Sequence, residues 1–461
     1  MKIHFIGIGG IGMSGLSSMY HAMGYEVSGS DRGADKPENQ RILEPLRKQG
    51  IRIYPQDGSF YETEKSDIVV YSSAIEADNA DFRVLPDTVR KMHRSEALQK
   101  IIIESSFKTT VAVSGSCGKS SVTAYLAETL LNCNINVDCL NGAIIKRFQA
   151  DDNVGNFRKG DGSVFVFEAD ESDKSLLNYG ADYAIILNIG TDHYDKAELA
   201  KMFGDFLQQI RKGAVITEEV FEAVKEVIPP GLTVRVASDR DGENVDEYIV
   251  SYTSGISGST AAYSGGSSIK LPKPGKHMAI NALCIKLMLQ MLGISEADAI
   301  GALGSFEGVW RRDDYAGTTA SGAEVFDDYA HNPEKILSCL SGMKERCSGS
   351  LFAIFQPHGY KPFGFMEAQL FEYMEKFLCP GDRFILLEPF YAGGTSSFSP
   401  SAREIHQKWS AASAAPERFI TLPDREAVKE FIAAHSQKGD VVTIMGARDN
   451  SLSDFAAELC C

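Results

Sequence analysis

The sequence lacks the features that mark membrane-spanning, exported or zinc-binding proteins. It has no apolar run of about 18 residues, the length that a helix needs to cross a bilayer. Its first residues lead directly into an apolar strand and a glycine turn, with no cleavage site. The nine cysteines are scattered, with no C-x-x-C pair and no His/Cys cluster at zinc spacing. We therefore expect a cytoplasmic protein with reduced thiols and no membrane segment.

Positive charge is also scarce. The chain has 46 Lys and Arg against 62 Asp and Glu, a formal net charge of −16. This balance argues against non-specific binding to nucleic acid or anionic membranes, although a locally basic pocket for phosphates remains compatible with it. The sequence therefore predicts a small-molecule partner.

Short apolar runs alternate with helix-sized gaps, a pattern typical of parallel α/β sheets. It predicts strands at residues 3–8, 25–28, 51–54, 68–71, 110–113, 164–167, 183–187, 214–217, 324–328, 351–356, 383–387 and 441–445. A Gly/Ser-rich passage at residues 251–268 predicts short strands in hairpins. At 461 residues, of which 44% are hydrophobic, the chain is long enough for about three domains. We expect them at residues 1–107, 108–313 and 314–461.

The most informative segment, residues 111–123, reads Val-Ala-Val-Ser-Gly-Ser-Cys-Gly-Lys-Ser-Ser-Val-Thr. Gly115 and Gly118 let the backbone turn its N–H groups inward, Lys119 supplies a positive charge, and Ser120 offers a hydroxyl to Mg²⁺. The loop lacks the first glycine of the common Walker pattern, so a Gly/Ser surface turn is the alternative. The apolar strand before it and the helical pattern after it favour a triphosphate-binding loop.

A second glycine loop, Gly-Ile-Gly-Gly-Ile-Gly at residues 7–12, follows a strand and opens a helix. With Asp31 after the next strand, it matches the dinucleotide-binding fingerprint. Such a loop binds a diphosphate and a sugar hydroxyl but does not specify a nicotinamide. An NAD(P)-dependent dehydrogenase is one interpretation. Two phosphate loops in consecutive domains favour another, in which one loop holds a nucleotide-activated substrate and the other holds ATP.

Carboxylates and a histidine follow two further predicted strands. Glu168 begins Glu-Ala-Asp-Glu-Ser-Asp at the end of one strand, and His193 ends Asn-Ile-Gly-Thr-Asp-His after the next. Hard oxygen ligands suit Mg²⁺, which makes Glu168 a candidate metal ligand, with a solvated helix cap as the alternative. Adjacent strands would direct Glu168 and His193 toward the edge that carries Lys119.

Taken in order, these motifs resemble the Mur ligase family, the ATP-dependent amide-forming enzymes of peptidoglycan synthesis, and most of all its alanine-adding branch. The resemblance covers essentially the whole chain. It also rests on Ser28-Gly-Ser-Asp31, Tyr71-Ser-Ser-Ala-Ile75, Gly275-Lys-His-Met-Ala-Ile-Asn281, residues 308–312, Asp327-Asp-Tyr-Ala-His-Asn-Pro333, Phe355-Gln-Pro-His358 and Gly446-Ala-Arg-Asp449. It implies an α/β fold with an N-terminal Rossmann-like domain, a central P-loop ATPase-like domain and a C-terminal Rossmann-like domain.

The resemblance also implies site residues. The sugar nucleotide, UDP-N-acetylmuramate, would contact Gly9, Gly10, Gly12, Asp31, Ser72 and Ser73. ATP would contact Gly115, Ser116, Gly118, Lys119, Ser120, Ser121, His277, Asn281, Arg312 and Asp328. The incoming amino acid would contact His331 and Lys361, Mg²⁺ would be held by Ser120, Glu168 and His193, and catalysis would depend on Lys119, Glu168, His193 and Arg312.

The implied reaction begins when ATP phosphorylates the lactyl carboxylate of the sugar nucleotide. The amine of an amino acid, L-alanine in this branch, then displaces phosphate from the acyl phosphate. Residues 203–210 lack the lysine that is carbamylated in several sister enzymes, as in the alanine-adding branch. We expect a monomer or weak homodimer.

The chain departs from the family pattern around the amino-acid pocket. After the Phe-Gln-Pro-His motif, this chain has Gly359 and Pro362 in the stretch where the branch carries arginines, and Lys361 is the nearby cation. In addition, Asn332 stands where the branch has a histidine. A recycling ligase that adds a whole peptide, a relative for another amino acid or sugar, and a catalytically silent sugar-nucleotide sensor are therefore alternatives. Cys117, which replaces a loop histidine, and the terminal Cys460 and Cys461 have no assigned role.

Overall fold

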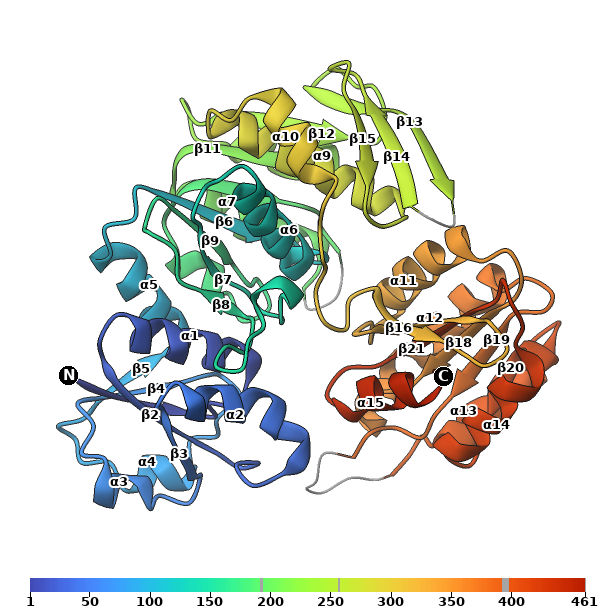
Figure 1. Cartoon of the computed structure of the whole chain (residues 1–461), viewed down its shortest axis with the longest axis horizontal. Coiled ribbons are helices and arrows are strands. Elements are labelled where there is room, and N and C mark those ends of the chain that lie inside the picture. Colours follow the sequence, from blue (N-terminus) through green and yellow to red (C-terminus); the bar gives the residue numbers. More distant parts are fainter. Residues whose placement is uncertain (191–193, 256–257, 392–397, 461) are drawn as a thin grey trace. The chain divides into compact units, whose positions relative to one another are not determined.

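The computed structural model describes residues 1–190, 194–255, 258–391 and 398–460. The chain divides into two compact units (Figure 1). Unit 1 comprises residues 1–252, 260–272 and 277–310, and unit 2 comprises residues 253–259, 273–276 and 311–461. Among the described residues, no helix combines the length and the apolar character needed to span a bilayer.

The first sheet of unit 1 is parallel, with the strand order β3-β2-β1-β4-β5. Its strands are β1 (Lys2–Ile6), β2 (Glu26–Asp31), β3 (Arg52–Pro55), β4 (Ile68–Tyr71) and β5 (Arg90–His93). Its helices are α1 (Ile11–Ala22), α2 (Gln40–Lys48), α3 (Phe60–Thr63), α4 (Ala80–Arg83) and α5 (Arg94–Glu104). The chain order reverses between β1 and β4, and ligands of such sheets bind where the carboxyl ends of these two strands separate.

The second sheet, which belongs to unit 1 apart from the adjoining ends of β13 and β14, has the order β15-β14-β13-β12-β11-β10-β6-β9-β7-β8. Its strands are β6 (Thr109–Ser114), β7 (Asp138–Leu140), β8 (Phe157–Arg158), β9 (Val164–Glu168), β10 (Ala181–Ile186), β11 (Ile210–Thr217), β12 (Thr233–Ser238), β13 (Glu247–Gly255), β14 (Gly258–Tyr263) and β15 (Ser268–Leu271). The accompanying helices are α6 (Lys119–Asn132), α7 (Lys196–Leu207), α8 (Glu218–Val224), α9 (Lys276–Met291) and α10 (Glu296–Leu303).

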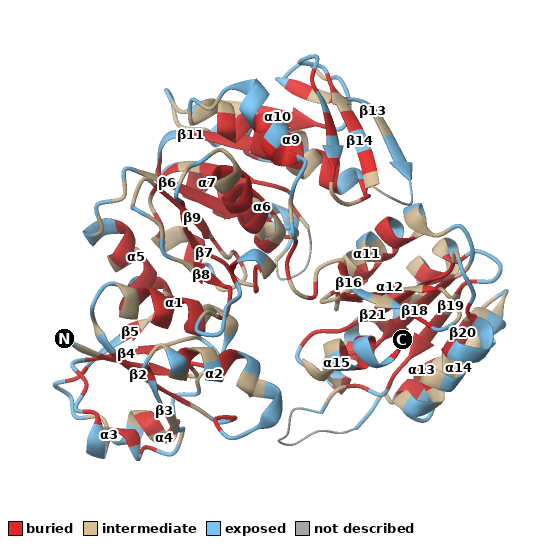
Figure 2. Ribbon diagram, viewed as in Figure 1, coloured by how far each residue is buried: buried red, intermediate tan, exposed pale blue. Residues whose placement is uncertain are grey.

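Alternation along β6 buries both faces of this second sheet. Val111 and Val113 pack in the cluster that contains Leu126 of α6 and Leu283 of α9, whereas Ala112 belongs to the cluster on the opposite face. Successive side chains of a strand point to opposite faces, so the continuous apolar run reflects a strand covered on both sides. Figure 2 shows β6 and its neighbour β9 as buried along most of their length.

Unit 2 contains a six-stranded sheet with the order β16-β17-β21-β18-β19-β20. Its strands are β16 (Asp314–Thr318), β17 (Glu324–Asp328), β18 (Leu351–Phe355), β19 (Arg383–Leu386), β20 (Phe419–Thr421) and β21 (Val441–Met445). Only the β16–β17 pair is antiparallel among the described strand pairs of this sheet. The helices are α11 (Pro333–Arg346), α12 (Tyr360–Phe377), α13 (Ala402–Ala412), α14 (Arg425–His435) and α15 (Ser451–Glu458).

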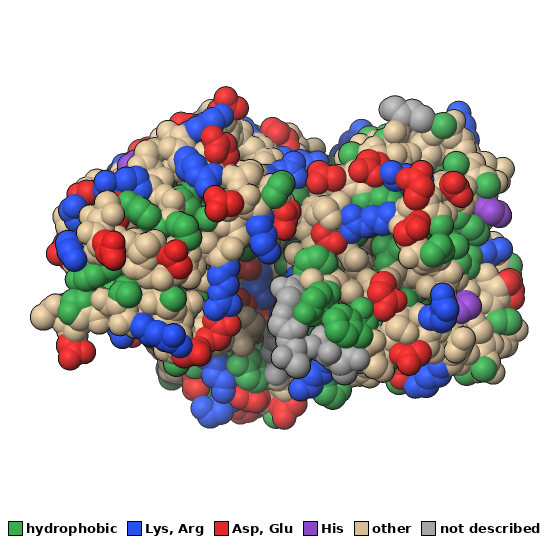
Figure 3. Space-filling model, turned by 90° about the horizontal axis from the view of Figure 1, so that it is seen from below, with side chains coloured by type: hydrophobic (Ala, Val, Ile, Leu, Met, Phe, Trp, Pro, Cys, Tyr) green, Lys and Arg blue, Asp and Glu red, His purple; other side chains and the backbone are tan. Residues whose placement is uncertain are grey.

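The surface carries mixed charge. In the view of Figure 3, acidic and basic side chains alternate over each part of the molecule rather than gathering into one basic face. The face seen in this view therefore carries both signs of charge side by side.

Candidate active site

The triphosphate-binding loop predicted at residues 115–120 connects the central strand β6 to helix α6. Gly118 precedes the helix with φ +86°, in the left-handed region that glycine adopts without strain. A Cβ on Gly115 would lie 3.0 Å from the Cβ of Leu187, so this position also leaves no room for a side chain. The loop thus presents the N-terminus of a 14-residue helix at the carboxyl edge of the sheet.

Asn188, at the end of β10, holds the loop from one side. Its Oδ1 accepts from the N–H of Cys117 at 2.8 Å, and its Nδ2 donates to the carbonyl of Cys117 at 3.0 Å. Ser116 Oγ accepts from the N–H of Gly190 at 2.8 Å. Asn281 lies near the other side, because its Nδ2 is 3.9 Å from a Cβ built on Gly118, and His277 lies one helical turn earlier on α9. The adenine-nucleotide residues predicted for unit 1 thus lie at or near this loop.

Lys119 is held by two carboxylates. Its Nζ lies 2.6 Å from Glu171 Oε2 and 3.6 Å from Asp170 Oδ1, and it donates to the carbonyl of Gly115 at 3.0 Å. Burial lowers the pKa of Lys119, but the nearby carboxylates, Glu171 above all, raise the pKa by a larger amount. The pKa of Lys119 therefore lies well above the usual value for a lysine. Lys119 therefore carries a full positive charge, as a phosphate-binding lysine requires.

Glu168 lies at the same edge as the loop. The register pairs it with Val113, two residues before Gly115, and its Oε2 accepts from the N–H of Gly142 at 2.8 Å. Its carboxylate and the hydroxyl of Ser120 are oxygen donors of the kind that Mg²⁺ prefers, so these two residues would be able to hold the ion. His193 lies outside the described residues, and the described residues contain no cluster of three or more metal-binding side chains.

The first glycine loop joins β1 to α1 at the point where the first sheet reverses. Asp31 accepts from the N–H of Gly9 at 2.9 Å and from the N–H of Gly33 at 2.8 Å. A Cβ on Gly9 would lie 2.7 Å from Asp31 Oδ2, so the glycine is required for this approach. Gly10 caps α1, and Gly12 lies in its first turn. Ser72 and Ser73 directly follow β4, on the other side of the reversal.

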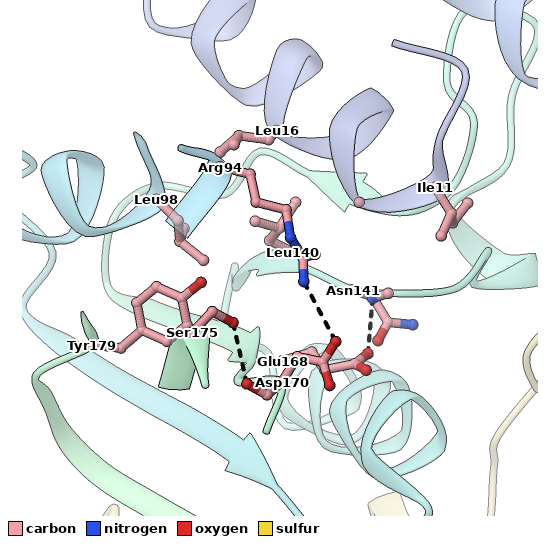
Figure 4. A pocket seen from close by; sticks show the side chains of 12 residues that line it. Ile11, Leu16, Arg94, Leu98, Leu140, Asn141, Glu168, Asp170, Ser175 and Tyr179 are labelled. Carbon is pink, nitrogen blue, oxygen red and sulfur yellow. Dashed lines mark hydrogen bonds and ion pairs between the residues drawn. The ribbon is translucent and has the colours of Figure 1, made fainter. Parts of the chain in front are cut away.

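A cavity of about 150 Å³ lies between this loop and the end of β9 (Figure 4). Gly12, Arg94, Asn141, Glu168 and Asp170 line it, together with apolar side chains such as Leu16, Leu98 and Leu140. The cavity therefore extends from the first glycine loop to two carboxylates, one of which, Asp170, also contacts Lys119.

Arg94, in the first turn of α5, is a charged cavity residue that sequence reasoning missed, as it also missed the polar residues Asn141, Ser175 and Tyr179. Arg94 contacts Asp173 at 2.7 Å and Asp170 at 3.5 Å, and its Nη1 is 3.1 Å from a Cβ built on Gly12. Burial lowers the pKa of this guanidinium, but the two aspartates raise it by more. The sequence signal was a helix start, His-Arg-Ser-Glu at residues 93–96, which forms a capping box but does not identify a ligand contact.

The predicted residues of unit 2 form a second group at the carboxyl edge of its sheet. Asp328 accepts from the N–H of Asp313 at 2.7 Å and from that of Ala330 at 2.8 Å. Burial raises the pKa of Asp328, and Arg312 opposes this increase. The guanidinium of Arg312 lies 4.9 Å from the centre of the Tyr329 ring.

The two residues predicted to contact the amino acid are in this group as well. His331 Nδ1 lies 2.9 Å from the carbonyl oxygen of Tyr329, and its ring is 5.3 Å from that of His358. Lys361 is exposed in the first turn of α12, with Nζ 5.9 Å from the ring centre of Phe365. Their position at the edge agrees with the expected site but does not assign a ligand.

Comparison with known proteins identifies the family. Three models match in order: "Mur ligase family, catalytic domain" at residues 2–105, "Mur ligase middle domain" at residues 113–288, and "Mur ligase, glutamate ligase domain" at residues 311–448. The UDP-N-acetylmuramate–L-alanine ligase of Agrobacterium fabrum is 32% identical over 477 residues, which cover 99% of this chain and 96% of that protein. This chain belongs to the Mur ligase family. The corresponding protein of Rhizobium meliloti is 31% identical over 491 residues, with the same coverage.

Solved Mur ligases share the fold. The UDP-N-acetylmuramate–alanine ligase MurC of Thermotoga maritima matches with a TM-score of 0.79 and 24% identity, covering 99% of this chain and 98% of that one. A murein peptide ligase of Psychrobacter arcticus matches with a TM-score of 0.67 and 20% identity, covering 100% and 98%. The predicted α/β architecture of three Mur ligase domains is therefore confirmed.

Proposed function

We propose that this Mur ligase uses ATP to join L-alanine to the lactyl carboxylate of UDP-N-acetylmuramate through an acyl phosphate, in peptidoglycan precursor synthesis. The full-length similarity to proteins named UDP-N-acetylmuramate–L-alanine ligase supports this substrate set. The proposal includes a cytoplasmic enzyme that is a monomer or weak homodimer, as the sequence predicts.

The observation that carries the proposal is the cavity lined by both Gly12 and Glu168. A diphosphate bound at the first glycine loop would place the sugar and its carboxylate in this cavity, directed toward the edge that carries Lys119. Asp31 fixes the loop, and a hollow of about 290 Å³ beside it, lined in part by Arg32, Gln56 and Asp57, provides space for a nucleoside. Ser72 and Ser73 are proposed as further contacts to the sugar nucleotide.

Both reactants of the first step are anionic, so bringing them together depends on neutralising charge. The loop N–H groups, the α6 N-terminus and Lys119 would bind the ATP phosphates, while Arg94 supplies positive charge inside the cavity. Bound Mg²⁺, for which Ser120, Glu168 and His193 are the proposed ligands, would withdraw charge from the transferred phosphoryl group. No strong nucleophile from the protein is required, because the carboxylate itself attacks.

In the second step, the amine attacks the acyl carbon and phosphate departs. The proposed contacts to the amino acid are His331 and Lys361, and those to the adenine nucleotide include His277, Asn281, Arg312 and Asp328. His331 accepts or donates at Nε2 according to its tautomer, because its Nδ1 lies 2.9 Å from the carbonyl of Tyr329.

A second candidate is a ligase that attaches a whole peptide to the same sugar nucleotide. The replacements at Asn332, Gly359 and Pro362 change the region where the amino acid is expected, and a murein peptide ligase shares the fold. The two candidates differ in the amine that the enzyme would use, a single amino acid or a whole peptide.

One assay tests both candidates. UDP-N-acetylmuramate, ATP and Mg²⁺ are supplied with a panel of amino acids and tripeptides, and phosphate release is measured. We expect release that requires L-alanine, and in the presence of hydroxylamine we expect a hydroxamate from the trapped acyl phosphate. Release with a tripeptide alone would favour the recycling ligase. Absence of ATP cleavage with every amine would refute the proposal.

A further inference from the structure

Arg448 lies on strained backbone in the loop that follows β21. Its φ is +27°, in the left-handed region that side chains other than glycine rarely adopt. The N–H of Asp449 donates to the carbonyl of Ala447, so Arg448 is the central residue of a three-residue turn. Strain of this kind persists only where the surroundings enforce it, and it is concentrated at functional sites.

The surroundings do enforce this turn. The buried guanidinium of Arg311 donates to the carbonyl of Gly446 at 2.7 Å and to the carbonyl of Asp449 at 3.0 Å, so it holds the backbone on both sides of Arg448. The carboxylate of Asp449 accepts from Arg425 at 2.7 Å and from the N–H of Ser451 at 3.0 Å. The loop is therefore rigid, and its conformation does not depend on the side chain at position 448.

The Arg448 side chain is exposed and makes no hydrogen bond or ion pair with any residue that the structure describes. No such bond within the described residues therefore offsets the backbone strain. A glycine would adopt this turn without strain, so the turn itself does not require the guanidinium.

The loop lies between the two loops that carry the predicted amino-acid residues. Strand β21 is flanked by β17 and β18. The N–H of Gly446 donates to the carbonyl of Asp328 at 3.2 Å, three residues before His331, and the N–H of Gln356 donates to the carbonyl of Met445 at 2.9 Å, two residues before His358. The rings of His331 and His358 are 5.3 Å apart. Arg448 therefore extends from the central loop of this edge.

We infer that Arg448 binds the α-carboxylate of the incoming amino acid. The loop after β18 has Gly359 and Pro362, so it offers no guanidinium, and the single ammonium of Lys361 cannot form a bidentate pair. A planar guanidinium on a rigid turn can bind a carboxylate through two parallel hydrogen bonds. This inference rests on the proposed function, because it requires an amino acid as the second substrate.

The test compares Arg448→Gly with the wild type on two amines that differ only in the group concerned, L-alanine and L-alaninamide. We expect the ratio of their kcat/KM values to fall about 10- to 100-fold, as expected for the loss of a charge-assisted pair. The KM values for ATP and the sugar nucleotide should not change. The Tm should stay the same or rise by about 2 °C, because glycine relieves the strain.

Two further variants separate charge from backbone. Arg448→Gln keeps a side chain on the strained turn and should lose the same discrimination, whereas Arg448→Lys should retain part of it. Arg403→Ala, which removes an exposed arginine from α13, is the matched control and should match the wild type. The inference would be overturned if Arg448→Gly and Arg448→Gln left the ratio of kcat/KM for L-alanine to that for L-alaninamide unchanged, or if they raised the KM for ATP instead. In that case the activity of the wild type with L-alanine would still support the proposed function. A wild type that turns over no amino acid would overturn the proposed function itself.

Discussion

At the scale of single residues, Lys119 has a buried carboxylate partner beside the proposed ATP site. Glu171 is nearly fully buried, with 2% of its side chain exposed, and Lys119 is its ion-pair partner at 2.6 Å. A phosphate that binds Lys119 would therefore share the ammonium with an internal anion. The pair raises the pKa of the lysine, and it predicts that removing the lysine affects stability as well as chemistry.

Replacing Lys119 by Met should lower kcat at least 100-fold, because it removes the cation that we propose stabilises the transferred phosphoryl group. It should also lower the free energy of unfolding by about 3 kcal/mol, since Glu171 remains buried without its partner. Adding Glu171→Gln should restore most of the stability but none of the activity. Denaturant unfolding and phosphate release measure the two effects.

The matched control for this pair is Lys201→Met, which breaks an exposed pair with Asp205 on α7 and should change neither quantity. A double variant that stays as unstable as Lys119→Met would contradict the structural role of Glu171.

Lys361 is the second residue whose charge can be tested for a role in substrate binding. Replacing it by Ala should raise the KM for the amino acid about 5-fold, the effect of one exposed charge, and leave the KM for ATP unchanged. Initial rates of phosphate release against amino-acid concentration measure this. Lys376→Ala, on the same helix, is the control. An unaltered KM for the amino acid would remove Lys361 from the site.

At the scale of elements, the predicted strands were those with continuous apolar runs, and each of them overlaps an observed strand. The apolar pattern could not predict β5, β7, β8, β12, β16 and β20. In β5 only Met92 is buried, because the strand lies at the edge of its sheet, and β20 is three residues long. Edge strands and very short strands carry too few buried side chains to produce a periodic signal. β12 is neither, since it lies between β11 and β13, but only its last three residues are buried.

In the candidate site too, only features that lie within a short stretch of sequence could be predicted. The glycine loops could be predicted because their chemistry lies within a few consecutive residues. Arg94 could not, because its contact with Asp173 joins positions 79 residues apart and depends on how α5 packs against the acidic loop. The strain at Arg448 also became visible only in the backbone angles.

Helix α6 provides a prediction about pH. Glu128 is buried in this helix, its Oε2 accepts from the N–H of Glu307 at 3.0 Å, and its Oε1 has no hydrogen-bond partner among the described residues. Burial raises its pKa from 4.5 to about 7. Folding therefore favours the protonated form, and the stability that this group contributes at low pH is lost as the pH rises toward 7.

Glu128→Gln should make the protein more stable at pH 8, by roughly 2 kcal/mol, and should change stability little at pH 4. The reason is that the amide is neutral at both values and can still accept from Glu307. Denaturant unfolding across this pH range provides the measurement, with the exposed Glu226→Gln as control. Equal effects of Glu128→Gln at the two pH values would show that Glu128 does not titrate in this range.

At the scale of the whole molecule, the proposed substrates draw on the two units unequally. The sugar-nucleotide residues from Gly9 to Ser73, and the cavity with Arg94 and Glu168, belong to unit 1. The proposed ATP residues are divided, because Lys119 and Asn281 belong to unit 1 whereas Arg312 and Asp328 belong to unit 2. We therefore expect substitutions at the proposed unit 2 residues to leave sugar-nucleotide binding unchanged and to weaken the use of ATP.

Arg312→Ala tests this division. It should lower kcat/KM for ATP about 100-fold, because a guanidinium that we propose contacts phosphate is lost, and leave the calorimetric affinity for UDP-N-acetylmuramate unchanged. Arg403→Ala, in the same unit, should alter neither value. Glu168→Gln should lower the kcat for ATP cleavage. Because Glu168 also lines the cavity proposed for the sugar nucleotide, this variant should lower the affinity for UDP-N-acetylmuramate as well. If Arg312→Ala weakened the sugar nucleotide as strongly as ATP, the sugar-nucleotide site would have to include unit 2, and the assignment of the cavity as its complete binding site would be wrong.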